Sequence, residues 1–148
     1  MKKQEPIILI FDNQVLDEYL KYYFKRYPRR SKKPIEEPIH PSINKWFIMP
    51  RPQMNNLKQA WGAFTDFVIN KNKVENLNIN KCSITYKYYF GNKRRQDVDN
   101  RICKFVNDSL IKNKIIIDDC YSHVNPMILW GGYDKENPRM ELHIHIKN

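Results

Sequence analysis

Apolar and polar residues alternate along two stretches of the chain, and this two-residue period predicts half-buried β-strands. The stretch 82–90 places one set of side chains on an inward face: Cys82, Ile84, Tyr86, Tyr88 and Phe90. The stretch 140–147 does the same, with Met140, Leu142, Ile144 and Ile146 inward and Glu141, His143, His145 and Lys147 outward. Shorter apolar runs at 6–11, 115–117 and 124–130 predict three further strands.

Apolar residues at intervals of three and four predict helices in three other regions. The first helix follows Asp12 or Asn13, either of which can cap it, and its apolar face holds Val15, Leu16, Tyr19, Leu20 and Tyr23. The second covers about 55–70, with an inward stripe of Leu57, Ala60, Trp61, Phe64 and Val68. The third is predicted to begin at Asn100, capped by Asp99 or Asn100, and to bury Ile102, Phe105, Val106, Ser109 and Leu110.

The order of these elements is not a regular alternation of strand and helix, so we expect an α+β domain with a mixed sheet packed against two or more helices. Residues 26–41 hold four prolines and many charges, which predicts a linker or an extended arm. We therefore expect an N-terminal extension over 1–35, made of a strand, a helix and this Pro-rich linker, and a main domain over 36–148. Residues 131–134, Gly-Gly-Tyr-Asp, predict a turn.

The 148 residues suit one domain, and 26 Lys and Arg against 16 Asp and Glu give a net charge of +10. Nucleic acid is the leading candidate for an anionic partner, although a generically basic soluble protein has the same composition. No apolar run is long enough to cross a membrane, so we expect no membrane partner. Three widely spaced cysteines indicate reduced thiols and a cytoplasmic location rather than a disulfide framework.

Acidic residues are scarce in this chain, yet two short segments gather them. Asp97 and Asp99 flank Val98, and Asp118-Asp119 follows the apolar run 115–117. Residues two apart on an extended backbone point the same way, so Asp97 and Asp99 can share one ion, and the strand ending at Asp119 can add a third carboxylate. Carboxylates favour hard cations such as Mg²⁺ or Mn²⁺. The pattern predicts a metal site facing a phosphate backbone.

A second interpretation of the same acids needs no metal. Asp99 could cap the third helix, and Asp118 and Asp119 could close a turn, because Asp is common at both kinds of position. Spacing alone does not separate this interpretation from the metal site. The basic run 93–95 immediately before Asp97 favours the metal site.

The segment 95–100, Arg-Gln-Asp-Val-Asp-Asn, with Lys104, Asp108 and Leu110 behind it and then Asp118-Asp119, resembles the signature of the RusA family of Holliday-junction resolvases. The segments 41–45 and 138–142 are similar to flanking parts of that family, so the resemblance covers about 38–146. It implies a homodimer of RusA-like fold and Mg²⁺-dependent phosphodiester hydrolysis at four-way DNA junctions, with Mn²⁺ as a possible substitute. No Gly-rich phosphate loop is present, and no small-molecule cofactor is expected. The biological context, including a phage or prophage origin, stays open.

Residue by residue, the resemblance implies metal ligation by Asp97, Asp99 and Asp119, with Asp118 as a weaker fourth ligand, and a catalytic role for Lys104. The family lysine stands four residues after the second Asp, where this chain has Cys103. Lys104 is five residues away, and Arg101 could replace it. We expect the flanking DNA backbone to be bound by Lys93, Arg94, Arg95, Asn100 and Arg101. The displaced lysine also leaves open a non-catalytic junction-binding protein with a degenerate site.

Overall fold

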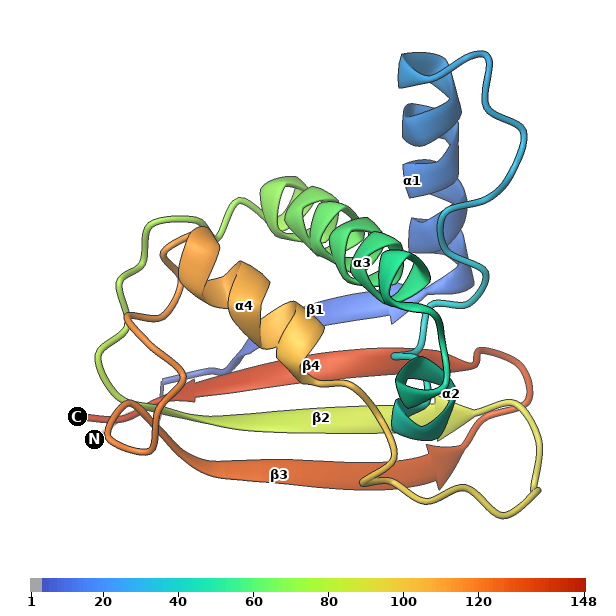
Figure 1. Ribbon diagram of the computed structural model, residues 1–148. Coiled ribbons are helices and arrows are strands. Elements are labelled where there is room, and N and C mark those ends of the chain that lie inside the picture. The colour runs from blue at the N-terminus through green and yellow to red at the C-terminus, as the bar shows by residue number, and fades with distance from the viewer. Residues whose placement is uncertain (1–3) are drawn as a thin grey trace.

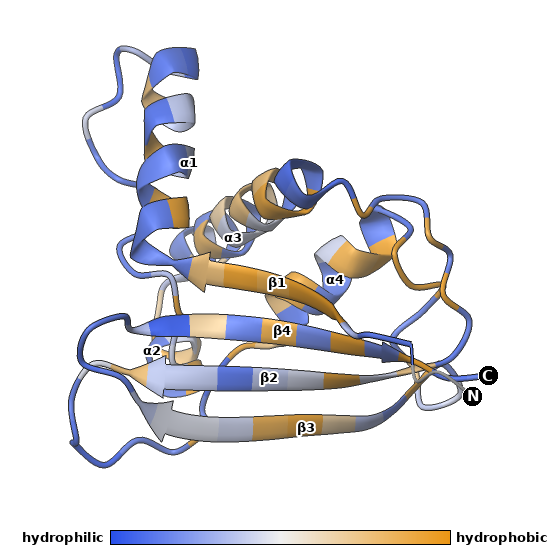
Figure 2. Cartoon of the chain, turned by 180° about the vertical axis from the view of Figure 1, so that it is seen from behind, coloured by the Kyte–Doolittle hydropathy of each residue, from blue (hydrophilic) through white to orange (hydrophobic). Residues whose placement is uncertain are grey.

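A four-stranded mixed sheet carries its helices on one face in the computed structural model, which describes residues 4–148 (Figure 1). The elements in chain order are β1 (Ile7–Asp12), α1 (Asn13–Arg26), α2 (Ile43–Phe47), α3 (Arg51–Asn72), β2 (Cys82–Phe90), α4 (Lys104–Lys112), β3 (Val124–Tyr133) and β4 (Arg139–Ile146). The expected α+β class and mixed sheet are confirmed. Figure 2 shows the opposite face of the sheet, over which no helix of the described chain lies.

The strands are arranged in the order β1-β4-β2-β3. β4 is antiparallel to both β1 and β2, whereas β2 and β3 are parallel. Parallel neighbours require a crossover connection. Here the crossover is the segment 91–123, which contains α4 and both acidic segments.

The core lies between the sheet and the helices α3 and α4. The predicted alternation is confirmed: Ile84, Tyr86 and Tyr88 of β2 are fully buried, and so are Met140, Leu142 and Ile144 of β4. These strand residues pack against the apolar stripe predicted for α3, of which Trp61, Phe64 and Val68 are buried. β1 adds Leu9 and Phe11 to the same core, so the N-terminal strand belongs to the one sheet.

The start of α1 follows the prediction closely. Asp12 is its N-cap, and the Asp12 Oδ1 atom accepts a hydrogen bond of 2.9 Å from the backbone N–H of Val15. Behind α1 the chain runs without helix or strand from Tyr27 to Pro41, as its prolines predict. Ile35 and His40 are nevertheless buried, so this segment packs along the domain.

Three predicted features are wrong. The third predicted helix, α4, begins at Lys104 instead of Asn100, and its N-cap is Cys103, so neither Asp99 nor Asn100 caps it. The run 115–117 forms one parallel bridge, between Ile79 and Ile116, instead of a strand. Residues 131–133 continue β3, and the turn follows them.

The outward face of β4 departs from the prediction at one residue. His143 points to the helix-free face, yet only 9% of it is exposed, because β4 lies between β1 and β2. Its Nε2 atom is 2.9 Å from Oε1 of Glu141, whose other oxygen accepts a hydrogen bond from Arg139. No helix within residues 4–148 is both long and apolar enough to cross a membrane.

Candidate nucleic-acid and metal site

The first acidic segment forms a turn. The backbone N–H of Asn100 donates to the Asp97 carbonyl oxygen over 3.1 Å, so the backbone is not extended between Asp97 and Asp99 as the sequence suggested. Both carboxylates are exposed. The Asp97 side chain is 60% exposed and lies 3.7 Å from Nε of Arg95, a contact that water screens strongly.

This turn is held by the segment 40–44, which lies nearly sixty residues earlier in the chain. The Ile43 N–H donates to the Asn100 carbonyl, and the Ile102 N–H donates to the Pro41 carbonyl, both over 3.2 Å. The Asn100 side chain accepts from Asn44 N–H (3.3 Å) and donates to the Ser42 hydroxyl (3.1 Å). Asn100, predicted as a DNA contact, therefore has a structural role in tying the two segments together.

Arg101 is anchored inside the protein rather than extended into solvent. Its guanidinium donates to the His40 carbonyl (3.1 Å) and to Oε1 of Gln96 (2.7 Å), and it lies 5.1 Å from the centre of the Phe90 ring. Burial lowers the pKa of this guanidinium. Two N–H groups of the guanidinium already donate hydrogen bonds within the protein. Arg101 therefore stabilises the acidic turn and has fewer donors left for a ligand.

A buried polar cluster beneath this turn was not expected from the sequence. The Tyr88 hydroxyl is 3.1 Å from Nδ1 of His40 on one side and 3.1 Å from Sγ of Cys103 on the other. His40 is fully buried, and burial, followed by the charge of Arg101, lowers its pKa to about 3. The only signal in the sequence was the inward position of Tyr88 on β2, since nothing local marks His40 as buried.

Val98, between the two aspartates, fixes the turn onto the sheet. A Cβ atom added to Gly131 of β3 would lie 2.4 Å from the Val98 Cγ1 atom. Glycine therefore permits this close approach, which explains why 131 is a strand glycine and not part of a turn. Gly131 is paired in register with Tyr88, so the first acidic segment lies over this level of the β2–β3 pair.

The second acidic segment follows α4 and precedes β3. Asp118 is exposed, and its Oδ1 atom accepts the backbone N–H of Asp119 (2.8 Å). Asp119 is half-buried. The Tyr86 hydroxyl of β2 donates to the Asn107 side-chain oxygen. Burial, with smaller contributions from Cys103, Asp119 and Asp108, holds the pKa of the Tyr86 hydroxyl well above its ordinary value.

Val98 of the first acidic segment thus approaches Gly131 of β3, and the charge of Asp119 in the second contributes to the raised pKa of Tyr86 on β2. The carboxylates do not, however, come together: within residues 4–148, no three His, Cys, Asp or Glu side chains are close enough to share one metal ion. As placed, Asp97, Asp99, Asp118 and Asp119 do not fit a ready-made Mg²⁺ site.

Lys104 stands at the first position of α4. Its side chain is 70% exposed, and the Nζ atom forms an ion pair of 3.2 Å with Asp108, one helical turn further on. Residues 100–103, between Asp99 and Lys104, lie ahead of the helix. The direction in which the Lys104 side chain points therefore depends on the residue at which α4 begins.

The basic loop 91–96 forms an exposed rim beside the acidic turn. The Nζ atom of Lys93 lies 5.2 Å from the centre of the Tyr133 ring, and the Arg94 N–H donates to Asn92. Lys93, Arg94 and Arg95 are all exposed, as residues that meet phosphates must be.

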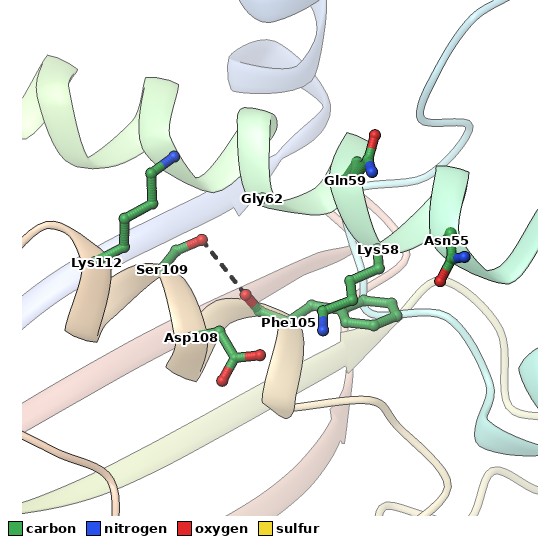
Figure 3. Close-up of a pocket in the computed structure, with 8 residues that line it drawn as sticks. All are labelled: Asn55, Lys58, Gln59, Gly62, Phe105, Asp108, Ser109 and Lys112. Atoms are coloured by element: carbon green, nitrogen blue, oxygen red, sulfur yellow. Dashed lines mark hydrogen bonds between the residues drawn. The ribbon is translucent and has the colours of Figure 1, made fainter.

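A small polar pocket of about 330 Å³ opens between α3 and α4 (Figure 3). Asn55, Lys58 and Gln59 line it from α3, and Asp108, Ser109 and Lys112 from α4. Ser109 donates to the Phe105 carbonyl (3.4 Å), and Lys112 is paired with Asp66 (2.8 Å). Asp108 is shared with the ion pair of Lys104, which is the pocket's one link to the candidate site among the described residues.

No protein-family model matches this chain, and a search of curated proteins finds no significant match.

Proposed function

We propose that this protein is a metal-dependent endonuclease that acts on branched DNA, with four-way junctions as its preferred substrate. The main support is that the segment 95–100, which resembles the RusA signature, is hydrogen-bonded to the segment 41–45, which resembles another part of that family. Two segments that are far apart in sequence and share one resemblance are thus held side by side, which supports the proposal. The charge of Asp119 in the second acidic segment contributes to the raised pKa of Tyr86 on β2, and an exposed basic rim flanks the first segment.

In this proposal Asp97, Asp99 and Asp119 are the candidate ligands of Mg²⁺, which Mn²⁺ could replace, and Asp118 is a weaker one. A divalent ion would supply charge stabilisation for phosphodiester hydrolysis. The carboxylates are not gathered in this structure, so no reaction step is assigned to an ion between them. Lys104 is the candidate phosphate contact, because it is exposed and, within residues 4–148, forms an ion pair only with Asp108. Lys93, Arg94 and Arg95 are the candidate backbone contacts.

One observation favours a second candidate function, a junction-binding protein without nuclease activity. The dispersed carboxylates are compatible with DNA binding by the basic rim alone. Binding by basic side chains needs no metal, and its affinity falls steeply with salt. The two functions differ in one measurement, which is whether a bound junction is nicked.

The test uses synthetic four-way junctions with Mg²⁺ or Mn²⁺. We expect paired nicks from the wild-type protein and a loss of at least about 100-fold in rate for Asp97→Asn and for Asp119→Asn. Asp17→Asn is the matched control, because Asp17 is exposed on α1 and outside the site. Nicking by both site variants at the wild-type rate would contradict the nuclease assignment. Tight binding without nicking by the wild type would support the junction-binding protein.

We also propose that the helix-free face of the sheet is the dimer interface. Ile8 and Ile10 of β1 and Ile128 and Trp130 of β3 expose 40–45% of their surfaces on this face. A two-fold dimer would match the symmetry of a four-way junction. The mass in solution should fall from dimer to monomer in Trp130→Glu but not in Leu77→Glu, a similarly exposed residue away from the sheet. A dimer that persists in Trp130→Glu would exclude this face.

A further inference from the structure

A wide groove lies between α1, α3 and the segment that follows α1, separate from the acidic turn. Its volume is about 1430 Å³, larger than most pockets for small molecules. Figure 1 shows α1 standing away from the sheet with the following segment looped beside it. The size and open shape suit a segment of polymer better than a compact ligand.

One wall of the groove is aromatic. Tyr19, Tyr22, Tyr23 and Tyr27 line it from α1 and its C-cap, and Phe67 lines it from α3. Tyr22 is 50% exposed, and its ring centre is 5.6 Å from that of Phe67. An exposed ring supported from behind by another ring can accept a flat ligand on its free face.

The rim of the groove is basic. Arg26, Arg30, Lys32 and Lys33 line it, and within residues 4–148 none of them forms an ion pair with a carboxylate. Arg30 lies 4.2 Å from the centre of the Tyr27 ring and donates to the Tyr23 hydroxyl (2.9 Å). These contacts hold the guanidinium in place without neutralising its charge.

The two acids of the groove are already neutralised. Glu18 pairs with Lys71 (2.5 Å), and Asp66 pairs with Lys112 (2.8 Å) and accepts a hydrogen bond from Asn113. The remaining charged side chains that line the groove are basic, and the tyrosine rings line it with them.

We infer that this groove binds an unpaired strand of DNA, with bases against Tyr22 and its neighbouring rings and phosphates against Arg26, Arg30, Lys32 and Lys33. Basic edges with aromatic walls are the general means of holding single strands. A duplex keeps its bases stacked inside and presents only phosphates, so it would leave the tyrosines unused. The inference does not depend on the nuclease proposal, because the groove shares no residue with the acidic segments.

The test measures fluorescence anisotropy of a labelled oligothymidine of about 15 nucleotides with the full-length protein, in the absence of divalent ions. We expect Tyr22→Ala to weaken binding by about 5-fold or more, and Tyr22→Phe, which keeps the ring, to bind as the wild type does. Lys32→Gln/Lys33→Gln should reduce the slope of log K against log salt by about 1.4. The matched control, Lys81→Gln/Lys114→Gln, removes two exposed lysines outside the groove and should leave this slope unchanged.

Circular dichroism of each variant separates lost binding from lost folding. Equal affinities for the wild type and Tyr22→Ala, or tighter binding of a duplex than of the single strand, would overturn the inference. Preference for an oligouridine over the oligothymidine would also overturn it, in favour of RNA. Because no nicking is measured, a negative result here leaves the nuclease proposal unaffected, and loss of nicking in Asp97→Asn leaves this one unaffected.

Discussion

The side-chain amide of Asn100 donates a hydrogen bond to the hydroxyl of Ser42, 3.1 Å away and 58 residues earlier in the chain. The same side chain accepts a hydrogen bond from the backbone of Asn44. One asparagine therefore joins the acidic turn to the segment before α2. The conformation of the turn depends on this contact as much as on its own sequence.

Asn100→Ala removes both side-chain hydrogen bonds. We expect a loss of about 1–2 kcal/mol in the free energy of unfolding, measured in urea, because each bond contributes about 0.5–1.5 kcal/mol. Asn92→Ala is the control, since the Asn92 side chain accepts one hydrogen bond in the exposed loop and its loss should cost less than about 0.5 kcal/mol. Equal losses in the two variants would show that Asn100 does not hold the turn.

Gly131→Ala tests the close contact with Val98. The added methyl would lie 2.4 Å from the Val98 Cγ1 atom, so the turn carrying Asp97 and Asp99 must move. We expect slower junction nicking and a loss of about 1–3 kcal/mol in stability. Gly62→Ala in α3 is the matched control, because the nearest heavy atom is 4.0 Å away and the helix should gain up to about 1 kcal/mol. Similar effects of both substitutions would contradict the proposed contact.

Tyr86→Phe should leave the Asn107 side-chain oxygen buried without its donor. The expected cost is about 1–3 kcal/mol in the free energy of unfolding. Tyr89→Phe on the helix-free face is the comparison, because the Tyr89 hydroxyl has no hydrogen-bond partner within residues 4–148 and the ring beneath Arg139 is kept. A loss below about 0.5 kcal/mol for Tyr86→Phe would show that Asn107 finds another donor.

His40 gives stability a specific pH dependence. Its pKa is lowered to about 3 in the folded protein, against about 6.5 in the unfolded chain. Below pH 6.5 the unfolded chain binds the extra proton, so stability should fall on acidification from pH 6.5 towards pH 3 by up to about 1.4 kcal/mol per pH unit from this group. Above pH 7 the group contributes no slope.

Urea unfolding of the wild type and of His40→Leu between pH 4 and pH 8 checks this. The variant should be the less stable of the two at pH 8, because the Tyr88 hydroxyl loses a partner, and the gap should narrow as the pH falls. Parallel stability curves over the whole range would contradict a buried, neutral His40.

Patterns formed by residues that are close in sequence predicted most of the fold. The alternation over β2 and β4, the stripe of α3 and the Asp12 cap all depend on residues close in sequence, and all are confirmed. The start of α4 was wrong because Asn100 binds Ser42 and Asn44 instead of capping a helix. The glycines at 131 and 132 suggested a turn, but the first of them is needed where Val98 approaches β3. Burial of His40 and His143 likewise depends on distant strands.

The candidate site was predictable as residue types but not as an arrangement. Its acids, Lys104 and basic run are visible in the sequence, whereas the turn at Asp97–Asn100 and the inward bonds of Arg101 arise from contacts with the segment 40–44. The tyrosine–arginine groove combines α1 with α3, so no single stretch of sequence reveals it.

The helix α4 limits how the length of the crossover segment 91–123 can change. The nine residues of α4 separate the acidic turn from Asp118-Asp119, and they span about 13–14 Å as a rigid rod. One residue inserted within the rod would lengthen it by about 1.5 Å and rotate one end by about 100°. The residues between Asp99 and Lys104 lie before the rod begins, so a change in their number would alter neither the length nor the phase of the rod. A change in chain length inside α4 would therefore rotate one acidic segment relative to the other.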